Sequence, residues 1–210
     1  MRLDEALFKI KKTRMNCLRT SDIAAICAIK NDYACHIATR LAESGHLTRL
    51  KRDLWCISDM ADPMLIPLWI TAPFPAYISL QTALFLHGMI SQVPVVNYCV
   101  SPARTRIFRT PAGIFSVHHI ADDFFLGYET DDKTGVRMAV PEKALLDFLY
   151  LSPAKSGNFT SLPELEFPRN FNVGKAHRMI RNISSRQRRT MLERCFEKTI
   201  QNRVKDSNGF

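Results

Sequence analysis

The sequence predicts an α+β protein with a small helical N-terminal unit, a second mixed α/β domain and terminal helices. Three observations support this fold class. The first sixty residues combine short helical periodicities with two extended runs, and the middle of the chain contains strand-like runs rich in Val, Ile, Tyr and Phe. Helical periodicity then returns after residue 173. With 210 residues, of which 46% are hydrophobic, the chain can form one large domain or two small ones.

Apolar residues spaced three and four apart predict an amphipathic helix over residues 3–12, whose outer face carries lysines. A second, short helix is expected in "TSDIAAICAIK" (20–30), where Thr20 or Ser21 can cap the free amides. Asn31 is suited to cap a third helix, whose inward positions are 34, 37, 38 and 41. The first forty-five residues are therefore expected to form three helices.

A basic hairpin is expected after these helices. Gly45 can end the third helix because the left-handed conformation found there favours glycine. Two extended runs follow, "HLTRL" (46–50) and "LWCIS" (54–58). Helix, helix, turn, helix and hairpin is the order of a winged helix-turn-helix, in which the third helix enters the DNA major groove and the hairpin reaches phosphate or the minor groove. We therefore expect residues 1–60 to bind DNA.

The predicted DNA contacts divide by chemistry. Basic side chains of the hairpin are suited to phosphates, namely Arg49, Lys51 and Arg52. Polar side chains on the outer face of the third helix can reach base edges, namely Tyr33, His36, Thr39 and Arg40. The alternative is a protein-docking module, since small helical units with a hairpin also bind proteins and a Lys-Arg pair on a loop is often simply solvated.

The charge is unevenly distributed along the chain. Lys and Arg number 29 against 20 Asp and Glu, for a net charge of +9, which favours partners bearing phosphate or anionic lipid. Residues 1–60 hold 11 basic and 7 acidic residues, residues 61–150 hold 6 and 8, and residues 151–210 hold 12 and 5. A second basic patch is possible on the connection "RTRIFR" and near the C-terminus, although a solvated surface would look the same; its members are Arg104, Arg106, Arg109, Arg186, Arg188 and Arg189.

The cysteines and the N-terminus point to a reduced compartment. The six cysteines contain no CxxC pair and are scattered through apolar runs, which argues against a zinc site or a disulfide framework. The N-terminus has no sustained apolar segment, and no stretch approaches the roughly 18 uninterrupted apolar residues of a membrane span. We expect a cytoplasmic protein that binds no metal or cofactor.

The domain organisation is predicted from residues that typically end or interrupt helices and strands, such as proline and glycine. Four prolines near residues 61–76 indicate an interdomain linker with one extended apolar piece. The second domain is expected over residues 77–204, with a helix between Ser79 and Gly88, strands in "VVNYCVS" and "GIFSVHHI", and a strand leading into a helix in "VRMAVPEKALLDFLY". Residues 152–170 are expected to form a loop, one or two helices should follow residue 173, and residues 205–210 should be a disordered tail.

No catalytic residue is predicted. Glu142, Lys143 and Asp147 invite comparison with metal-dependent nucleases, but Glu142 and Lys143 are adjacent at a helix start and project in different directions. We expect Glu142 to offset the helix dipole and Lys143 to be exposed. His118 and His119 are neighbours on a strand, so they face opposite sides and cannot hold one metal together. A nuclease-like, nucleic-acid-processing enzyme is the alternative function.

The N-terminal unit followed by "YISLQTALFLHGM", "VHHI" and "RMAVPEKALLDFLY" resembles the AbiEi-type antitoxin family, the transcriptional regulators of type IV toxin–antitoxin (abortive infection) systems. The resemblance spans about residues 5–150. It implies a repressor that binds inverted repeats at its own promoter, either as a single molecule or as two molecules that bind cooperatively. It also implies that the second domain counteracts a nucleotidyltransferase-like toxin without a stable complex. The chain departs from the family at the hairpin tip, where Asp53, Leu54 and Trp55 replace glycine, an apolar residue and tyrosine.

Overall fold

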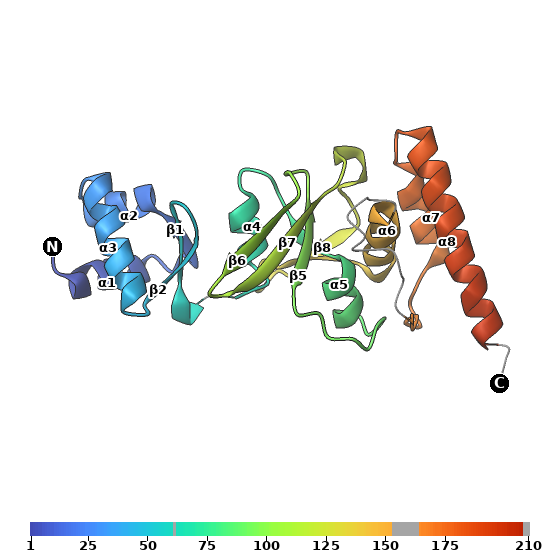
Figure 1. Cartoon of the computed structure of the whole chain (residues 1–210), viewed down its shortest axis with the longest axis horizontal. Coiled ribbons are helices and arrows are strands. Elements are labelled where there is room, and N and C mark those ends of the chain that lie inside the picture. Colours follow the sequence, from blue (N-terminus) through green and yellow to red (C-terminus); the bar gives the residue numbers. More distant parts are fainter. Residues whose placement is uncertain (61, 153–163, 208–210) are drawn as a thin grey trace.

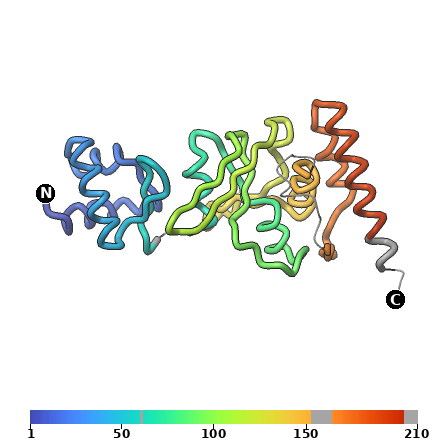
Figure 2. The backbone as a smooth tube through the Cα atoms, in the orientation of Figure 1, coloured from blue at the N-terminus to red at the C-terminus, as the bar shows by residue number. Residues whose placement is uncertain are grey.

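The computed structural model describes residues 1–60, 62–152 and 164–207 and shows an α+β protein, as predicted. The molecule is elongated, with the N-terminal helices at one end and the C-terminal helices at the other (Figures 1 and 2). Two hydrophobic cores lie along this axis, a smaller one in the N-terminal unit and a larger one in the second domain.

The N-terminal unit contains the three expected helices and the expected hairpin. The helices are α1 (Leu3–Lys12), α2 (Thr20–Cys27) and α3 (Asn31–Glu43), and the hairpin strands are β2 (Leu47–Lys51) and β3 (Leu54–Ile57). A strand that the sequence did not predict, β1 (Cys17–Arg19), pairs with β3, giving an antiparallel sheet of order β1-β3-β2. Its three residues are too few to show an alternating pattern.

The expected helix caps are wrong. Arg19 and Lys30 occupy the N-cap positions of α2 and α3, so Thr20 and Asn31 are the first helical residues. The Thr20 hydroxyl instead accepts a hydrogen bond of 3.0 Å from the indole N–H of Trp55, which fixes α2 against β3. At the hairpin tip, Asp53 adopts a left-handed φ of +58°, a conformation that a short polar side chain tolerates better than most.

The three-stranded sheet lies between the two cores. On β3, Trp55 and Ile57 pack into the core of the N-terminal unit, whereas Leu54 and Cys56 pack into the core of the second domain. This division follows the period of a strand, whose successive side chains point to opposite faces. The hairpin sheet is therefore a shared layer that fixes the N-terminal unit on the second domain.

The second domain is built on a six-stranded mixed sheet of order β6-β7-β5-β4-β9-β8, in which β4–β9 and β5–β7 are the parallel pairs. Its strands are β4 (Tyr77–Ile78), β5 (Asn97–Ser101), β6 (Arg106–Thr110), β7 (Gly113–His119), β8 (Tyr128–Thr130) and β9 (Arg137–Ala139). The stretch "RTRIFR", expected as a connection, forms most of the edge strand β6. This strand contacts β2 of the N-terminal unit.

The helices of the second domain pack mainly around α6 (Pro141–Leu151), which contacts α5 (Leu80–Leu86), α7 (Val173–Arg181) and α8 (Arg186–Ser207). Ser79 and Gly88 bracket α5 as predicted. The linker was expected to be extended, but it contains the helix α4 (Ile66–Thr71), because Ile66 and Ile70 reach the larger core from one helical face. Short 3₁₀ turns occur at Ser58–Met60 and Asp122–Phe124.

The terminal predictions are met in part. Two helices follow residue 173, as expected. Most of the loop predicted over residues 152–170 lies outside the described residues. Of the predicted disordered tail, residues 205–207 belong to α8 and residues 208–210 lie outside the described part of the chain.

All six cysteines are unpaired. Within the described ranges, none of the helices has the length and apolarity needed to cross a membrane.

The two neighbouring histidines of β7 face opposite sides, as predicted: His118 is buried and His119 is exposed. The ring of His118 lies 2.9 Å from the Ser116 hydroxyl, and its burial lowers its pKa to about 4 from 6.5. The unfolded chain therefore binds more protons between these two values, so stability is lost as the pH falls through this window.

We expect His118 to make the protein acid-sensitive. Lowering the pH from 7 to 5 should reduce the free energy of unfolding of the wild type by about 2 kcal/mol more than that of His118→Gln, because glutamine does not titrate. Urea denaturation at both pH values measures this difference. His119→Gln is the matched control and should follow the wild type, since that ring is already exposed. Identical pH dependence in wild type and His118→Gln would contradict the assignment.

Candidate nucleic-acid interface and a buried polar network

The outer face of α3 is available to a partner. Its inward residues are fully or almost fully buried, and the four residues predicted to read bases are all exposed: Tyr33, His36, Thr39 and Arg40. His36 and Arg40 lie one helical turn apart and so project side by side. The Thr39 hydroxyl donates to the Cys35 carbonyl at 2.9 Å, which leaves its oxygen as an acceptor. This face thus offers both hydrogen-bond donors and acceptors.

The hairpin, whose strand β2 contacts α3, carries two exposed arginines. The Arg49 guanidinium lies over the Trp55 ring, 5.4 Å from its centroid, a cation–π contact that favours one orientation of the arginine. Arg52 stands at the tip with its side chain 92% exposed, 3.6 Å from the Asp53 carboxylate. An exposed ion pair of this kind contributes little to stability, so Arg52 can leave it for a phosphate at small cost.

Lys51 does not lie at the free tip, contrary to the sequence prediction. It is the last residue of β2, and its ammonium donates to the Ile70 carbonyl of α4 at 2.8 Å. Its partial burial and the nearby positive charges of Arg19 and Arg106 lower its pKa. The structure therefore gathers three basic residues where the hairpin meets the second domain.

Arg19 was not selected from the sequence, and Lys51 and Arg106 were assigned to two different basic surfaces. Arg19 ends the unpredicted strand β1, where it pairs with Leu54, which in turn pairs with Lys51 across the sheet. Arg106 begins β6, the edge strand that contacts β2. Local sequence patterns predict neither β1 nor β6, and they do not show that β6 contacts β2. The grouping of these three residues therefore depends on the tertiary fold. We call Arg19, Lys51 and Arg106 the junction cluster.

The other basic residues of the predicted second patch occupy two places. Arg104 and Arg109 are exposed at the start and near the end of the β6 region, and Arg186 is exposed at the start of α8. Arg188 is exposed but has its guanidinium 4.8 Å from the centroid of the Tyr150 ring, and Arg189 is half-buried. Thr105 and Arg188 line one cavity, so the segment before β6 and the beginning of α8 lie close together.

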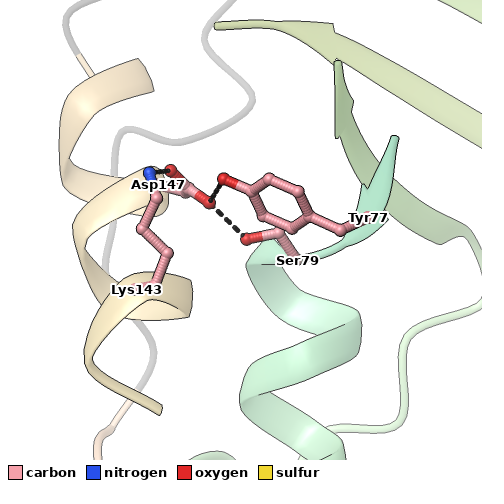
Figure 3. A network of polar contacts seen from close by, with 4 residues as sticks. All are labelled: Tyr77, Ser79, Lys143 and Asp147. Carbon is pink, nitrogen blue, oxygen red and sulfur yellow. Dashed lines mark hydrogen bonds and ion pairs between the residues drawn. The ribbon is translucent and has the colours of Figure 1, made fainter. Parts of the chain in front are cut away.

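A buried polar network joins two of the quoted sequence motifs, "YISLQTALFLHGM" and "RMAVPEKALLDFLY" (Figure 3). One oxygen of Asp147 accepts hydrogen bonds from the Ser79 hydroxyl at 2.6 Å and from the Tyr77 hydroxyl at 3.1 Å. Its other oxygen is bonded to the Lys143 ammonium, one turn earlier on α6. All four side chains are buried. The network thus ties α6 to β4 and the start of α5.

The expectation that Lys143 is exposed is wrong. Its ammonium is fully buried between Asp147 and the Phe124 ring, whose centroid lies 3.3 Å away. Burial lowers the pKa of Lys143 to about 8, while Asp147 opposes this shift. Burial likewise raises the pKa of Asp147, and Lys143 opposes that change. The buried charge is tolerated because a carboxylate and an aromatic face replace the water that would otherwise solvate it.

Glu142 and Asp147, the carboxylates that were compared with metal ligands of nucleases, accept hydrogen bonds from other groups of the protein. Both oxygens of Asp147 accept hydrogen bonds from side chains, and one oxygen of Glu142 accepts the backbone N–H of Asn172 at 2.7 Å. In the described ranges, no three His, Cys, Asp or Glu side chains converge as a metal-binding group. The Lys143–Asp147 network has the arrangement of a structural tie, and Glu142 connects α6 to the start of α7.

No family model matches this chain, and no curated protein matches it. Among solved structures, the solution structure of the antibiotic-resistance factor ANT(2'')-Ia matches with a TM-score of 0.32 and 10% identity. The match covers 70% of this chain and 95% of that chain. A TM-score this low does not establish a common fold.

Proposed function

We propose that this protein is a sequence-specific DNA-binding transcriptional repressor whose residues 1–60 form a winged helix-turn-helix. The observation that carries the proposal is the exposed polar face of α3 beside an exposed basic hairpin. In this mode of binding, α3 lies in the major groove, where His36 and Arg40 can reach base edges, and the hairpin acts as the wing, with Arg52 on the backbone. No chemistry on the DNA is required.

The junction cluster supports the same proposal. Three like charges are held together although they repel one another, and phosphate oxygens are the natural counter-ions for such a surface. Because the sheet is shared between the two cores, the wing and β6 keep a fixed relation to each other. In this proposal the second domain extends the backbone contact beyond the wing, through Arg106.

The family resemblance specifies the biological role that we propose. The protein would act as the antitoxin of a type IV toxin–antitoxin system and repress its own operon by binding inverted repeats. The buried network supports this role indirectly, because the motifs "YIS" and "PEKALLD" supply its four residues. The toxin would be a nucleotidyltransferase-like protein encoded beside this one. Finding such a reading frame next to this gene is the simplest check.

Fluorescence anisotropy tests the DNA-binding proposal. The purified protein is titrated onto DNA from its own upstream region and onto a scrambled duplex of the same length, at low and at physiological salt. We expect at least about tenfold preference for the upstream DNA, retained at the higher salt, because base contacts survive when counter-ion release weakens. Equal, salt-sensitive binding to both duplexes would contradict sequence-specific recognition. Absence of DNA binding would favour the protein-docking alternative.

A further inference from the structure

A cavity of about 750 Å³ lies at the β8 edge of the large sheet, far from the proposed DNA-binding face along the sheet order. It opens to solvent and is lined by the β8–β9 hairpin, the end of α5 and the starts of α6 and α7. The volume is within the range of about 300–1,000 Å³ that small-molecule sites occupy. None of the residues singled out in the sequence for DNA binding lines it.

The lining combines carboxylates with an apolar wall. Glu129, Asp131 and Glu142 contribute negative charge, and Lys175 contributes a positive one. The apolar part of the wall comes from Met64, Leu86, Val136 and Met138. The cavity is therefore net acidic and partly apolar. Such a lining favours a ligand that carries a positive charge on an apolar body.

Glu142 lines this cavity and has an unused acceptor oxygen. Its side chain is 3% exposed, and Oε1 accepts the backbone N–H of Asn172. Among the described residues, Oε2 has no hydrogen-bond partner; the Lys175 ammonium is 3.9 Å away, beyond hydrogen-bond distance. A buried carboxylate oxygen without a donor is costly, so a donor supplied by a ligand would be bound favourably.

We propose that this cavity binds a small organic cation, in which a guanidinium or primary ammonium group donates to Oε2 of Glu142. The charged group would lie near Glu142, and the apolar part of the ligand would lie against Leu86 and Met138. Charge-assisted hydrogen bonds between such donors and a carboxylate are about twice as strong as neutral ones. The site is independent of the DNA-binding proposal, since it uses none of the same residues.

Calorimetric titration of the full-length protein with agmatine tests the proposal, because agmatine carries both a guanidinium and an ammonium on a short apolar chain. Glu142→Gln is the informative variant. Glutamine keeps the carbonyl that accepts the Asn172 N–H but presents an NH₂ group in place of Oε2 and removes the charge. We expect it to bind agmatine at least about tenfold more weakly than the wild type.

A second variant moves affinity in the opposite direction. Lys175→Met removes the positive charge beside Glu142, so it should bind agmatine more tightly than the wild type. Glu197→Gln, an exposed change on α8 outside the cavity, is the charge-matched control and should bind like the wild type. Thermal unfolding of each variant without ligand shows whether it is folded.

Three outcomes would overturn the proposal: no binding of agmatine by the wild type at millimolar concentration, equal affinity of wild type and folded Glu142→Gln, or tighter binding of inorganic phosphate than of agmatine. The last result would show that Lys175, and not Glu142, determines the charge that the cavity selects. Because the readout is direct binding without DNA, failure here leaves the DNA-binding proposal untouched, and failure of DNA binding leaves this one intact.

Discussion

Replacing Asp147 by Ala is expected to lower the free energy of unfolding by about 3–5 kcal/mol, because it leaves the buried Lys143 ammonium without its anion. The loss extends beyond the ion pair, since the Ser79 and Tyr77 hydroxyls also lose their acceptor. Urea denaturation followed by circular dichroism measures the change. Because a domain is typically stable by about 5–15 kcal/mol, the variant should be markedly less stable and, if wild-type stability is low, largely unfolded.

The double variant Lys143→Met/Asp147→Leu separates the effect of charge from that of packing. Removing both charges together leaves no ion unpaired, so this variant should recover most of the stability that Asp147→Ala loses. Folded Asp147→Ala should also gain stability from pH 7 to pH 10. Lys143 already has a pKa of about 8 beside Asp147, and losing the anion lowers it further, so the unfolded chain then binds more protons. A loss under 1 kcal/mol in Asp147→Ala would contradict the structural role of the network.

Much of the local structure could be predicted from the sequence because it depends on neighbouring residues. The helix α1 has the predicted bounds, and α3 contains the predicted apolar stripe although it begins one residue earlier than expected, since both stripes recur at helical spacing. Gly45 and Gly88 adopt the left-handed conformations expected at helix ends. The strands β5 and β7 lie within the predicted runs, which are rich in residues that favour strands.

The features that the sequence did not predict depend on tertiary contacts. The strand β1 is three residues long and exists because β3 supplies its hydrogen bonds. The burial of Lys143 could not be expected from a helix start, because Phe124 and Ser79 come from distant parts of the chain. The pair Lys143 and Asp147 at i, i+4 was the one local signal, but that spacing is equally common on exposed helix faces.

Most of the candidate interface was predicted from the residue types of α3 and the hairpin, and the structure corrects the position of Lys51. All four predicted α3 residues are exposed, and so are Arg49 and Arg52. Lys51 differs because β2 continues one residue further than expected, and a register shift between Arg49 and Lys51 pairs Lys51 with Leu54 while its ammonium reaches α4. A one-residue shift along a strand changes the face on which a side chain lies, and local sequence patterns do not fix strand ends to one residue. The hairpin contact with β6 is likewise not visible in local patterns.

A combined His36→Ala/Arg40→Ala variant is expected to lose about a hundredfold or more of its affinity for the upstream DNA, since each base contact provides about 1–3 kcal/mol of discrimination. Its affinity for scrambled DNA should fall only severalfold, because only Arg40 carries a permanent positive charge. Arg52→Ala should weaken binding to both duplexes by a similar factor and reduce the slope of log affinity against log salt by about 0.9, the value for one phosphate contact.

Lys12→Ala is the matched control for charge, because Lys12 is an exposed basic residue on α1 outside the proposed interface. It should bind both duplexes within about twofold of the wild type, because an exposed charge that does not contact the DNA is weakened by salt screening. If the α3 variant and Lys12→Ala lose affinity equally, net charge alone drives binding. If the α3 variant loses equally on upstream and scrambled DNA, α3 contacts the backbone and the bases are read elsewhere.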